Sequence, residues 1–484
     1  MKQCSVYIDG KFSSSVTDGR FESINPYTRE PWATVPRCNH ADVRLAIDSS
    51  RRAFRDPSWF GINGSSRGAV LRRIGDVLSA QVESLAEIET LDIGKPLNDT
   101  LKQIAYLPEW FYYYGGLADK IGGEVIPTDQ EGMFNYTQYE PLGVVSAITP
   151  WNSPLMLACW KLAPALAAGN TVILKPSEFA SVSTCEFMKA IHEAGVPPGV
   201  VNLVTGFPGD LGLGLVNDPH IAKVTFTGSS AVGSRIATVA GGDITPFTLE
   251  LGGKSAQIVC RDACLEDAAD GIVSGLFVLN GQSCVAGSRL LVQKSVKREF
   301  LEILLGKVSE LKMGDPRDPR TQIGPMANEA QFAKTLEFIG TAKREGAACI
   351  HGGSVSTRPG CAGGWFIEPT IFTGVTADMT IAQEEIFGPV LAVMDFAEDE
   401  EALNLANGVR YGLAAGVWTE SIARAHQFAK GLECGTVYVN TYKNISVTSP
   451  AGGFKKSGIG RENGVEAFRE FVQMKSVWLR TRRR

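Results

Sequence analysis

Short apolar segments of strand length alternate with segments of helix length through the middle of the chain. From about residue 143, strands are expected at Val144–Ile148, Thr171–Leu174, Val201–Val204 and Lys223–Phe226, and a helix at 181–194 lies between two of them. Such alternation predicts right-handed crossovers in a parallel, doubly wound sheet. Ligands of these sheets bind at the carboxyl ends of the strands.

A second region with the same alternation runs from about residue 255 to 447. Its strands are expected at Gln257–Cys260, Arg289–Val292, Val390–Phe396, Gly416–Thr419 and Thr436–Asn440. The chain has no tandem repeat and no low-complexity linker, so a boundary near residue 252 follows from the restart of the pattern. The fold class predicted is therefore α/β, with two doubly wound parallel sheets.

The remaining segments are scaffold or edge elements. A hairpin is expected at Val6–Phe12, and amphipathic helices at Asp42–Phe54 and Arg67–Leu91. The segment Gly122–Glu140 alternates like strands after a Gly-Gly turn and is expected to protrude. The stretch Phe471–Leu479 resembles an edge strand that pairs with another element.

Composition and charge exclude several classes of protein. The 484 residues, 44% hydrophobic and 20% charged with a net charge of -5, fit a globular protein of two or three domains. The negative balance gives no electrostatic reason to bind nucleic acid or an anionic membrane, and neither partner is expected. The chain ends in Arg-Thr-Arg-Arg-Arg at 480–484, a solvated terminus or an anion-binding tail.

Cysteine and histidine usage bears on compartment and chemistry. No signal peptide and no run of membrane-spanning length is visible at the sequence level, so a cytoplasmic location is expected. The ten cysteines form no CxxC pair or zinc pattern and read as mostly buried, reduced thiols. The five histidines are far apart, so no metal site is expected and imidazole is not expected to activate a cysteine.

Polar residues at the predicted strand ends suit cofactor binding. Lys175 and Glu178 can hydrogen-bond vicinal hydroxyls of a ribose, and the carboxylate would favour NAD over NADP; a surface ion pair is the alternative. Gly228-Ser229 opens a helix whose N-terminus can hold a pyrophosphate. The amide of Asn152 can donate to an oxyanion, although asparagine in a loop is also a common turn residue.

Cys284 and Glu250 are the candidate reactive pair. Cys284 follows a Gly-Gln turn and precedes Val-Ala-Gly, a small-residue setting that can expose its sulfur, while a structural cysteine is the alternative. Glu250 lies 34 residues earlier in Leu-Glu-Leu-Gly-Gly-Lys. A sulfur nucleophile and a carboxylate base are the two groups that a covalent thioester mechanism needs.

Taken together, these segments resemble the aldehyde dehydrogenase superfamily over nearly the whole chain. The ordered motifs that carry the resemblance are Pro150-Trp151-Asn152, Lys175-Pro176-Ser177-Glu178, Phe226-Thr227-Gly228-Ser229, Leu249-Glu250-Leu251-Gly252-Gly253-Lys254, Gly281-Gln282-Ser283-Cys284, Glu384-Glu385-Ile386-Phe387-Gly388-Pro389, and Gly452-Gly453-Phe454-Lys455 leading to Ser457-Gly458.

The resemblance implies oxidation of an aldehyde to an acid through a thiohemiacetal and a thioester on Cys284. Asn152 and the Cys284 backbone N–H would hold the oxyanion, Glu250 would activate water, and Lys161 and Glu462 match a proposed proton path. The expected cofactor is NAD, with NADP as the alternative. The implied cofactor contacts are Ile148, Thr149, Pro150, Trp151, Lys175, Ser177, Glu178, Gly209, Gly228, Ser229, Val232, Leu251, Glu385 and Phe387, with Glu385 on the nicotinamide ribose and Trp151 near the adenosine side.

The resemblance also implies an architecture and an assembly. The dinucleotide-binding domain, Rossmann-like, would comprise residues 1–118 and 142–252, the catalytic domain, also Rossmann-like, residues 253–456, and a small β bridging and oligomerisation element residues 119–141 and 457–484. The bridging strands pair across subunits in relatives, so a homodimer or homotetramer is expected.

The substrate is expected to be a small-molecule aldehyde, bulky or aromatic or aliphatic, or a semialdehyde. Residues implied to line its tunnel are Ser153, Leu157, Trp160, Val278, Ser283, Val285, Ile445 and Ala451. Small residues at 153 and 451 disfavour betaine aldehyde, whose cation is held by aromatic rings. Lys443 at the mouth would attract an acidic substrate or be a solvated lysine. A cysteine-dependent hydrolase or acyltransferase without nicotinamide, and a non-catalytic scaffold, are the alternative functions.

Overall fold

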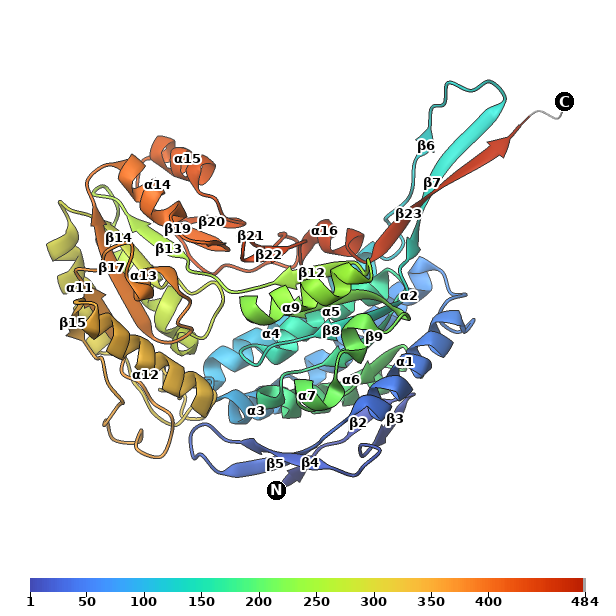
Figure 1. Ribbon diagram of the computed structural model, residues 1–484, viewed down its shortest axis with the longest axis horizontal. Coiled ribbons are helices and arrows are strands. Elements are labelled where there is room, and N and C mark those ends of the chain that lie inside the picture. The colour runs from blue at the N-terminus through green and yellow to red at the C-terminus, as the bar shows by residue number, and fades with distance from the viewer. Residues whose placement is uncertain (482–484) are drawn as a thin grey trace.

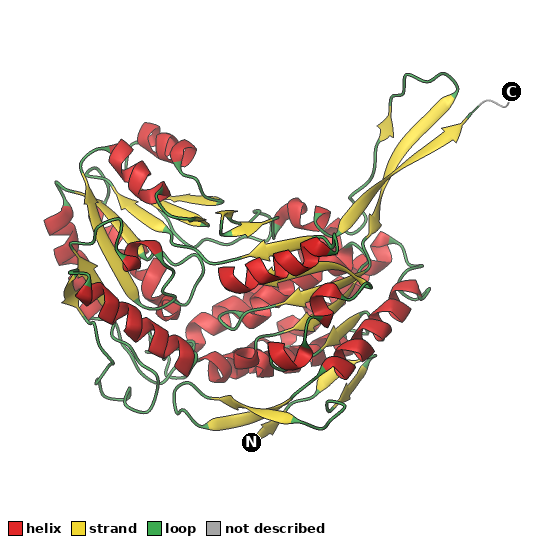
Figure 2. Ribbon diagram, in the orientation of Figure 1, coloured by secondary structure: helices red, strands yellow, loops and turns green. Residues whose placement is uncertain are grey.

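The computed structural model describes residues 1–481 and contains two α/β units side by side, with a β arm projecting from one of them (Figures 1 and 2). The predicted fold class is confirmed. The arginines at 482–484, and with them most of the tail considered above, lie outside the described residues.

The first unit is built on an eight-stranded sheet of order β22-β12-β11-β8-β9-β10-β2-β3. The five strands from β12 to β10 in this order pair in parallel. At the two ends of the sheet, β22, β2 and β3 pair antiparallel with their neighbours. The strands are β2 (Val6–Ile8), β3 (Lys11–Ser13), β8 (Val144–Ile148), β9 (Thr171–Lys175), β10 (Val201–Leu203), β11 (Ile221–Thr227), β12 (Phe247–Glu250) and β22 (Gly458–Ile459). The helices of this part of the chain are α1 (His40–Arg55), α2 (Gly64–Ala80), α3 (Val82–Ile93), α4 (Leu97–Leu117), α5 (Pro154–Ala167), α6 (Ser181–Glu193), α7 (Pro208–Leu211), α8 (Gly214–Asn217), α9 (Ser230–Gly242) and α16 (Gly464–Arg469).

The second unit has a seven-stranded sheet of order β15-β16-β17-β14-β13-β19-β20, parallel except for β15. Its strands are β13 (Ala256–Val259), β14 (Arg289–Gln293), β15 (Ala348–His351), β16 (Thr370–Thr373), β17 (Val390–Phe396), β19 (Ala414–Trp418) and β20 (Thr436–Val439). Its helices are α10 (Leu265–Ile272), α11 (Lys297–Ser309), α12 (Glu329–Arg344), α13 (Thr380–Gln383), α14 (Asp399–Asn407) and α15 (Ile422–Gly431).

Three small sheets complete the molecule. The projecting arm is an antiparallel sheet of order β23-β7-β6, formed by β6 (Val125–Ile126), β7 (Met133–Pro141) and β23 (Val472–Arg480) (Figure 1). The other two sheets pair β1 (Lys2–Gln3) with β5 (Pro31–Pro36) and β4 (Arg20–Ile24), and β18 (Tyr411–Gly412) with β21 (Phe454–Lys455). No helix within residues 1–481 combines the length and apolar character needed to cross a membrane.

The strand predictions are confirmed to within one or two residues, and the protruding segment and the terminal strand pair with each other in the arm. The hairpin at Val6–Phe12 turns through Asp9 and Gly10, which both have positive φ, 55° and 76°, as a type I′ turn requires. The single helix predicted over 67–91 is wrong. The chain leaves helical geometry at Gln81, φ -112° and ψ 11°, and the two helices α2 and α3 pack separately against α4.

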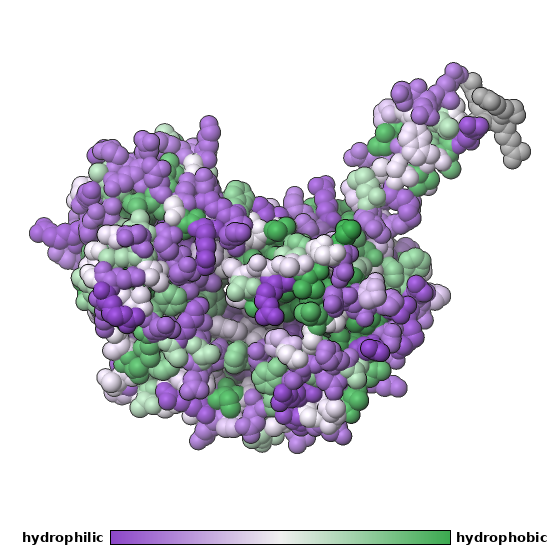
Figure 3. Space-filling model, in the orientation of Figure 1, coloured by the Kyte–Doolittle hydropathy of each residue, from purple (hydrophilic) through white to green (hydrophobic). Residues whose placement is uncertain are grey.

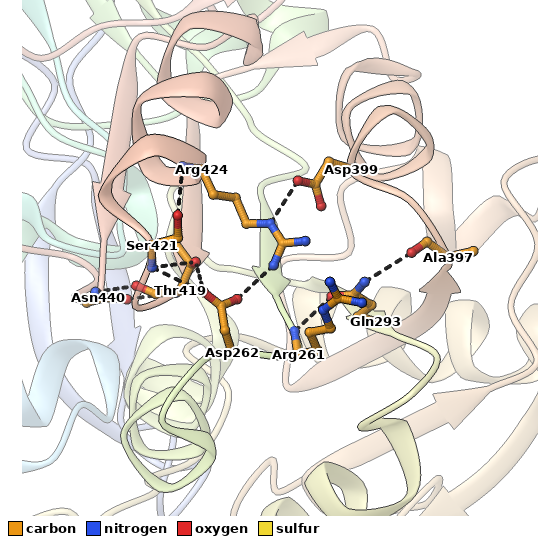
Figure 4. A network of polar contacts seen from close by, with 9 residues as sticks. All are labelled: Arg261, Asp262, Gln293, Ala397, Asp399, Thr419, Ser421, Arg424 and Asn440. Atoms are coloured by element: carbon orange, nitrogen blue, oxygen red, sulfur yellow. Dashed lines mark hydrogen bonds and ion pairs between the residues drawn. The ribbon is translucent and has the colours of Figure 1, made fainter.

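The carboxyl edge of the second sheet is filled by a network of protein side chains (Figure 4). Arg424 donates to Asp262 at 2.7 Å and to Asp399 at 2.8 Å, and Asp262 also accepts from the Thr419 hydroxyl at 2.7 Å. The Asn440 side chain bonds the Thr419 backbone through both its amide and its carbonyl. These groups satisfy one another, whereas the corresponding edge of the first sheet opens onto a cavity. Among the described residues, the polar groups at this edge of the second sheet are therefore bonded to one another.

Candidate active site

A cavity of about 120 Å³ lies where the carboxyl edge of the first sheet meets the second unit. Ten residues expected at the site line it, and four that were not predicted join them. The expected ones are Pro150, Trp151, Asn152, Gly228, Ser229, Glu250, Leu251, Cys284, Glu385 and Phe387. The additional ones are Thr227, Gly252, Gln331 and Lys334.

The loop that carries Cys284 has an unusual backbone. Leu279, Asn280 and Gly281 are all left-handed, with φ of 62°, 58° and 70°. A Cβ on Gly281 would lie 2.1 Å from the carbonyl oxygen of Gly388, so only glycine allows the two loops to approach this closely. The Asn152 amide donates to the carbonyl of Gln282 at 3.0 Å. These contacts hold Cys284 in the cavity at the carboxyl edge of the first sheet.

Cys284 is a half-buried residue that lines the cavity, and its thiol is not intrinsically activated. Burial raises the pKa of Cys284 to about 12, and the nearby Glu385 and Glu250 carboxylates add to this increase. Negative charge beside a thiol disfavours the thiolate, and only the thiolate is a strong nucleophile. The site therefore needs a base or an additional positive charge before Cys284 can react.

Glu250, at the end of β12, lines the same cavity and is the candidate base for activating water. Its side chain is 8% exposed, and Oε1 has no hydrogen-bond partner among the described residues. Burial raises the pKa of Glu250 well above its usual range, the Glu462 carboxylate adds to the increase, and the Lys161 ammonium opposes it. A carboxyl with a raised pKa can take a proton from a thiol or a water.

Lys161 and Glu462 form a fully enclosed ion pair next to Glu250. The Lys161 ammonium also donates to the hydroxyl of Thr227 at 2.7 Å. Glu462 is held by antiparallel backbone bonds to Ala451, at 2.7 and 2.8 Å. The structure thus brings Glu250, Lys161, Thr227 and Glu462 into one buried polar group.

The surroundings of the cavity fit a dinucleotide. The Trp151 and Phe387 rings meet edge to face at 5.2 Å, and Glu385 accepts a hydrogen bond from the Gly253 N–H at 3.0 Å. A Cβ on Gly252 would lie 2.3 Å from the Glu385 carboxylate, so glycine makes room for this acid. Ser229 caps α9, accepting from Val232 N–H at 3.4 Å, and leaves the helix N-terminus facing the cavity.

The other expected cofactor residues lie outside the lining of this cavity. Lys175 ends β9 and Glu178 follows three residues later, with their charged atoms 3.6 Å apart as an ion pair; contact of these two residues with a ribose stays a prediction. Burial lowers the pKa of Lys175. The rest lie at four places: Ile148 ends β8 and Thr149 follows it, Ser177 precedes Glu178, Gly209 lies on α7 and Val232 lies on α9.

The expected substrate residues do not form one lining. Leu157 and Trp160 lie in the core around α5 with Ala451 against them, and Ser153 is buried and accepts from Gln103 at 3.3 Å. Ser283 and Val285 flank Cys284, and Ile445 is exposed. Val278 lines a separate cavity of about 320 Å³.

Several residues of the site carried no sequence signal. Gln331 on α12 donates to the carbonyls of Ile386 and Phe387 at 2.8 and 3.1 Å and so fixes the loop behind Phe387. Tyr438 on β20 is close enough to Cys284 that a thiolate there would raise the Tyr438 pKa. Thr227 lies within the motif Phe226-Thr227-Gly228-Ser229. Its contact with the Lys161 ammonium became visible only in the structure.

The comparisons with known proteins agree with the resemblance noted in the sequence. The model of the Aldehyde dehydrogenase family matches residues 12–477. A (Z)-2-((N-methylformamido)methylene)-5-hydroxybutyrolactone dehydrogenase from Acinetobacter baylyi is 43% identical over 99% of this chain and 97% of its own. A betaine aldehyde dehydrogenase from Mesorhizobium japonicum is 41% identical over 99% and 97%.

Solved structures superpose on nearly the whole chain. Betaine aldehyde dehydrogenase from Staphylococcus aureus in complex with NAD+ has a TM-score of 0.98 and 38% identity, covering 99% of this chain and 95% of that one. The NAD+ complex of an aldehyde dehydrogenase from Bacillus cereus has a TM-score of 0.97 and 39% identity, covering 99% and 97%.

The raised pKa of Cys284 predicts slow, pH-dependent alkylation in the absence of ligand. Iodoacetamide should modify Cys284 slowly near neutral pH and faster as the pH rises, because the thiolate fraction grows toward the folded pKa of about 12. Glu385→Gln removes a negative charge and should shift this rise to lower pH. Peptide mass mapping separates Cys284 from the exposed Cys264. Rapid modification at neutral pH with no pH dependence would contradict the assignment.

Proposed function

Because the chain belongs to the aldehyde dehydrogenase family and is an oxidoreductase that acts on aldehydes, we propose that it converts an aldehyde to its carboxylic acid with NAD⁺ through a thioester on Cys284. One observation carries this proposal. Cys284, Asn152 and Glu250 come from three distant segments and line one cavity together with the expected cofactor residues.

The first half of the proposed reaction forms a bond to sulfur. The Cys284 thiolate adds to the carbonyl carbon, and the oxygen becomes an oxyanion. The Asn152 amide uses one N–H for the Gln282 carbonyl, and its second N–H can stabilise the oxyanion with the Cys284 backbone N–H. A dinucleotide bound at the cavity supplies the acceptor for the two electrons that leave with the aldehyde hydrogen. The acyl group then remains on Cys284 as a thioester.

The second half breaks that bond with water. Glu250 takes a proton from a water molecule as the water oxygen attacks the thioester carbon, and the Cys284 thiolate is the leaving group. The carboxylic acid is released. The buried ion pair of Lys161 and Glu462, with Thr227, provides groups through which the proton on Glu250 can move away. A relative that transfers its acyl group to coenzyme A has no need of this base, so Glu250 favours hydrolysis.

The site favours NAD over NADP. The Staphylococcus aureus and Bacillus cereus relatives, 38% and 39% identical to this chain, were solved in complex with NAD+. In this chain Glu178 would lie near the ribose 2′ position, where a carboxylate accepts a hydrogen bond from a hydroxyl and repels a phosphate.

The domain boundaries and the cytoplasmic location given above remain predictions.

The substrates for which relatives are named differ from one another. One relative is named for a hydroxybutyrolactone and others for betaine aldehyde, a quaternary ammonium compound. The bulky or aliphatic substrate stays a prediction, because Leu157 and Trp160 of α5 are packed into the core.

We also propose that the protein is a homodimer or a homotetramer. In the arm, the outer edge of β23 forms no ladder within residues 1–481, and it carries Met474, Trp478 and Leu479, which are 49–60% exposed. Apolar side chains also gather over the face where α9 lies (Figure 3). Val232 of α9 and Ile459 of β22 are exposed. An unpaired strand edge and an exposed apolar face are typical of subunit interfaces.

Two alternatives remain distinct from this proposal. A thiol hydrolase or acyltransferase would use Cys284 and Glu250 without nicotinamide and would form no NADH from any aldehyde. A non-catalytic scaffold would tolerate the substitution Cys284→Ala without loss of function in the cell.

Glu250→Gln should separate the two halves of the reaction. Mixing the variant with NAD⁺ and an aliphatic aldehyde should give a rapid burst of NADH of about one per active site, followed by turnover about 100–1000-fold slower than wild type. Rapid-mixing absorbance of NADH measures both phases, and Cys284→Ala, with no nucleophile, is the control that should show neither. Steady-state rates equal to wild type would refute the role of Glu250.

Glu178→Gln should narrow the preference for NAD. Removing the carboxylate should improve kcat/KM with NADP relative to NAD by about tenfold, because the repulsion of the 2′-phosphate is lost. Parallel assays of wild type and variant with both cofactors test this ratio. An unchanged ratio would place the ribose elsewhere.

Trp478→Lys should weaken the assembly. A charge on the free edge of β23 disfavours pairing with another strand, so light scattering should report a smaller mass than for wild type. Leu45→Lys, at an exposed position on α1 that is 51% accessible, is the matched control and should leave the mass unchanged. A wild-type monomer would overturn the proposal.

A further inference from the structure

A line of buried polar side chains runs along one face of the first sheet. Side chains two residues apart on a strand lie on the same face, so Lys223, Thr225 and Thr227 of β11 share one face. The pairing of β11 with β12 places Thr248 beside Thr225 and Glu250 beside Thr227. All of these residues are 1–8% exposed. The line therefore begins at Glu250, in the candidate active site, and extends roughly 13 Å away from it along the strand.

An ion pair lies at each end of the line. The inner pair, Lys161 and Glu462, adjoins Glu250 and is fully enclosed. At the far end, the Lys223 ammonium lies 3.1 Å from the Glu470 carboxylate, and these two residues form the outer pair.

The outer pair connects the buried line with solvent. The carboxylate oxygen of Glu470 that contacts Lys223 also accepts from the Thr248 hydroxyl at 3.1 Å. Lys223 lies over the Phe471 ring, 5.6 Å from its centroid, and its side chain is 2% exposed. The Glu470 side chain, in contrast, is 30% exposed. Glu470 is therefore the group through which the line reaches water.

Between the two pairs lies a hydroxyl with unused hydrogen-bonding capacity. Thr225 Oγ1 is buried and has no hydrogen-bond partner within residues 1–481, and the same holds for Oε2 of Glu462. A hydroxyl donates and accepts at the same time, so it can pass a proton on. Successive side chains of the line are roughly 6–7 Å apart at the backbone, a separation that side chains and a bridging water span together.

The charged groups along the line act on one another. Lys223 interacts electrostatically with both members of the inner pair. Glu250 interacts with the inner pair and, more weakly, with Arg461 and Glu470; the Arg461 guanidinium donates to the Gly460 carbonyl at 2.7 Å. Burial raises the pKa of Glu250 and lowers the pKa of Lys223, so both groups exchange protons closer to neutral pH than they would in water.

We propose that this line is the route by which the proton that Glu250 takes from water leaves the buried site for solvent. The inference rests on the proposed function. The Glu250 carboxyl passes its proton to the inner pair, and the Thr225 hydroxyl, with a bridging water, relays a proton to the outer pair. Glu470 releases one proton to solvent in each turnover. Only O–H and N–H bonds change, and Glu250 returns to the carboxylate that the next water needs.

The test removes the central hydroxyl without changing its volume. With NAD⁺ and whichever of propanal, hexanal and benzaldehyde wild type oxidises fastest, Thr225→Val should still form about one NADH per active site in the first turnover. Its kcat should fall about tenfold, and the ratio of kcat in H₂O to kcat in D₂O should rise above that of wild type. Thr225→Ser, which restores the hydroxyl, should recover the rate.

Two further variants complete the design. Glu470→Gln still accepts hydrogen bonds from Lys223 and Thr248 but cannot carry a proton, so it should lower kcat and raise the isotope ratio as Thr225→Val does. Thr184→Val removes another buried hydroxyl without a hydrogen-bond partner among the described residues, on α6, and is the matched control. It should leave kcat and the isotope ratio unchanged.

The outcomes separate the proton route from the proposed function. If wild type forms no NADH from any of the three aldehydes, the proposed function fails. If wild type turns over and either Thr225→Val or Glu470→Gln keeps its kcat, only the route is overturned. Equal slowing by Thr225→Ser and Thr225→Val, or slowing with an unchanged isotope ratio, would assign Thr225 a structural role and would also overturn the route.

Discussion

The hydrogen bond from the Asn152 amide to the Gln282 carbonyl joins the two α/β units at the point where the candidate chemistry takes place. Asn152 follows β8 of the first sheet, and Gln282 precedes Cys284 in the second unit. Three consecutive left-handed residues shape the same loop, and Gly281 lets it press against Gly388. The position of the thiol is therefore set by contacts between units and would be lost if they separated.

Burial dominates the electrostatics of this junction. Glu250, Glu385 and Cys284 all have a raised pKa because each is removed from water, and the two carboxylates raise the pKa of Cys284 further. The consequence is a thiol that stays protonated until a base or a positive charge assists it. A site of this kind limits side reactions of the cysteine when no ligand is present.

Positive charge is arranged differently on the two sides of the thiol. Beside Glu250, Lys161 is fully buried, and its charge is offset by the Glu462 carboxylate. Lys443, which follows β20, donates instead to the neutral carbonyl of Ser274. Lys254 offers a third case, since it is buried without a hydrogen-bond partner among the described residues and burial lowers its pKa to about 7. Nothing in the structure explains this lysine.

The sequence by itself determined the class of fold, most strands and the candidate reactive residues. Strand positions were readable because apolar runs of four to seven residues between helix-length segments have few other structural solutions. Cys284 and Glu250 stood out because a thiol and a carboxylate are reactive groups. The break at Gln81 was not readable, because an amphipathic pattern continues through it and only packing against α4 separates the two helices.

Tertiary structure alone decided which side chains share a cavity. Gln331 and Tyr438 are ordinary residues in sequence, and their roles arise from elements that pack on the Cys284 and Phe387 loops. The sequence left Lys443 open between a solvated and a substrate-binding lysine. The structure places its ammonium 3.4 Å from the Ser274 carbonyl, and a substrate contact stays a prediction. Charge and burial of a side chain depend on neighbours far away along the chain, and no local pattern records them.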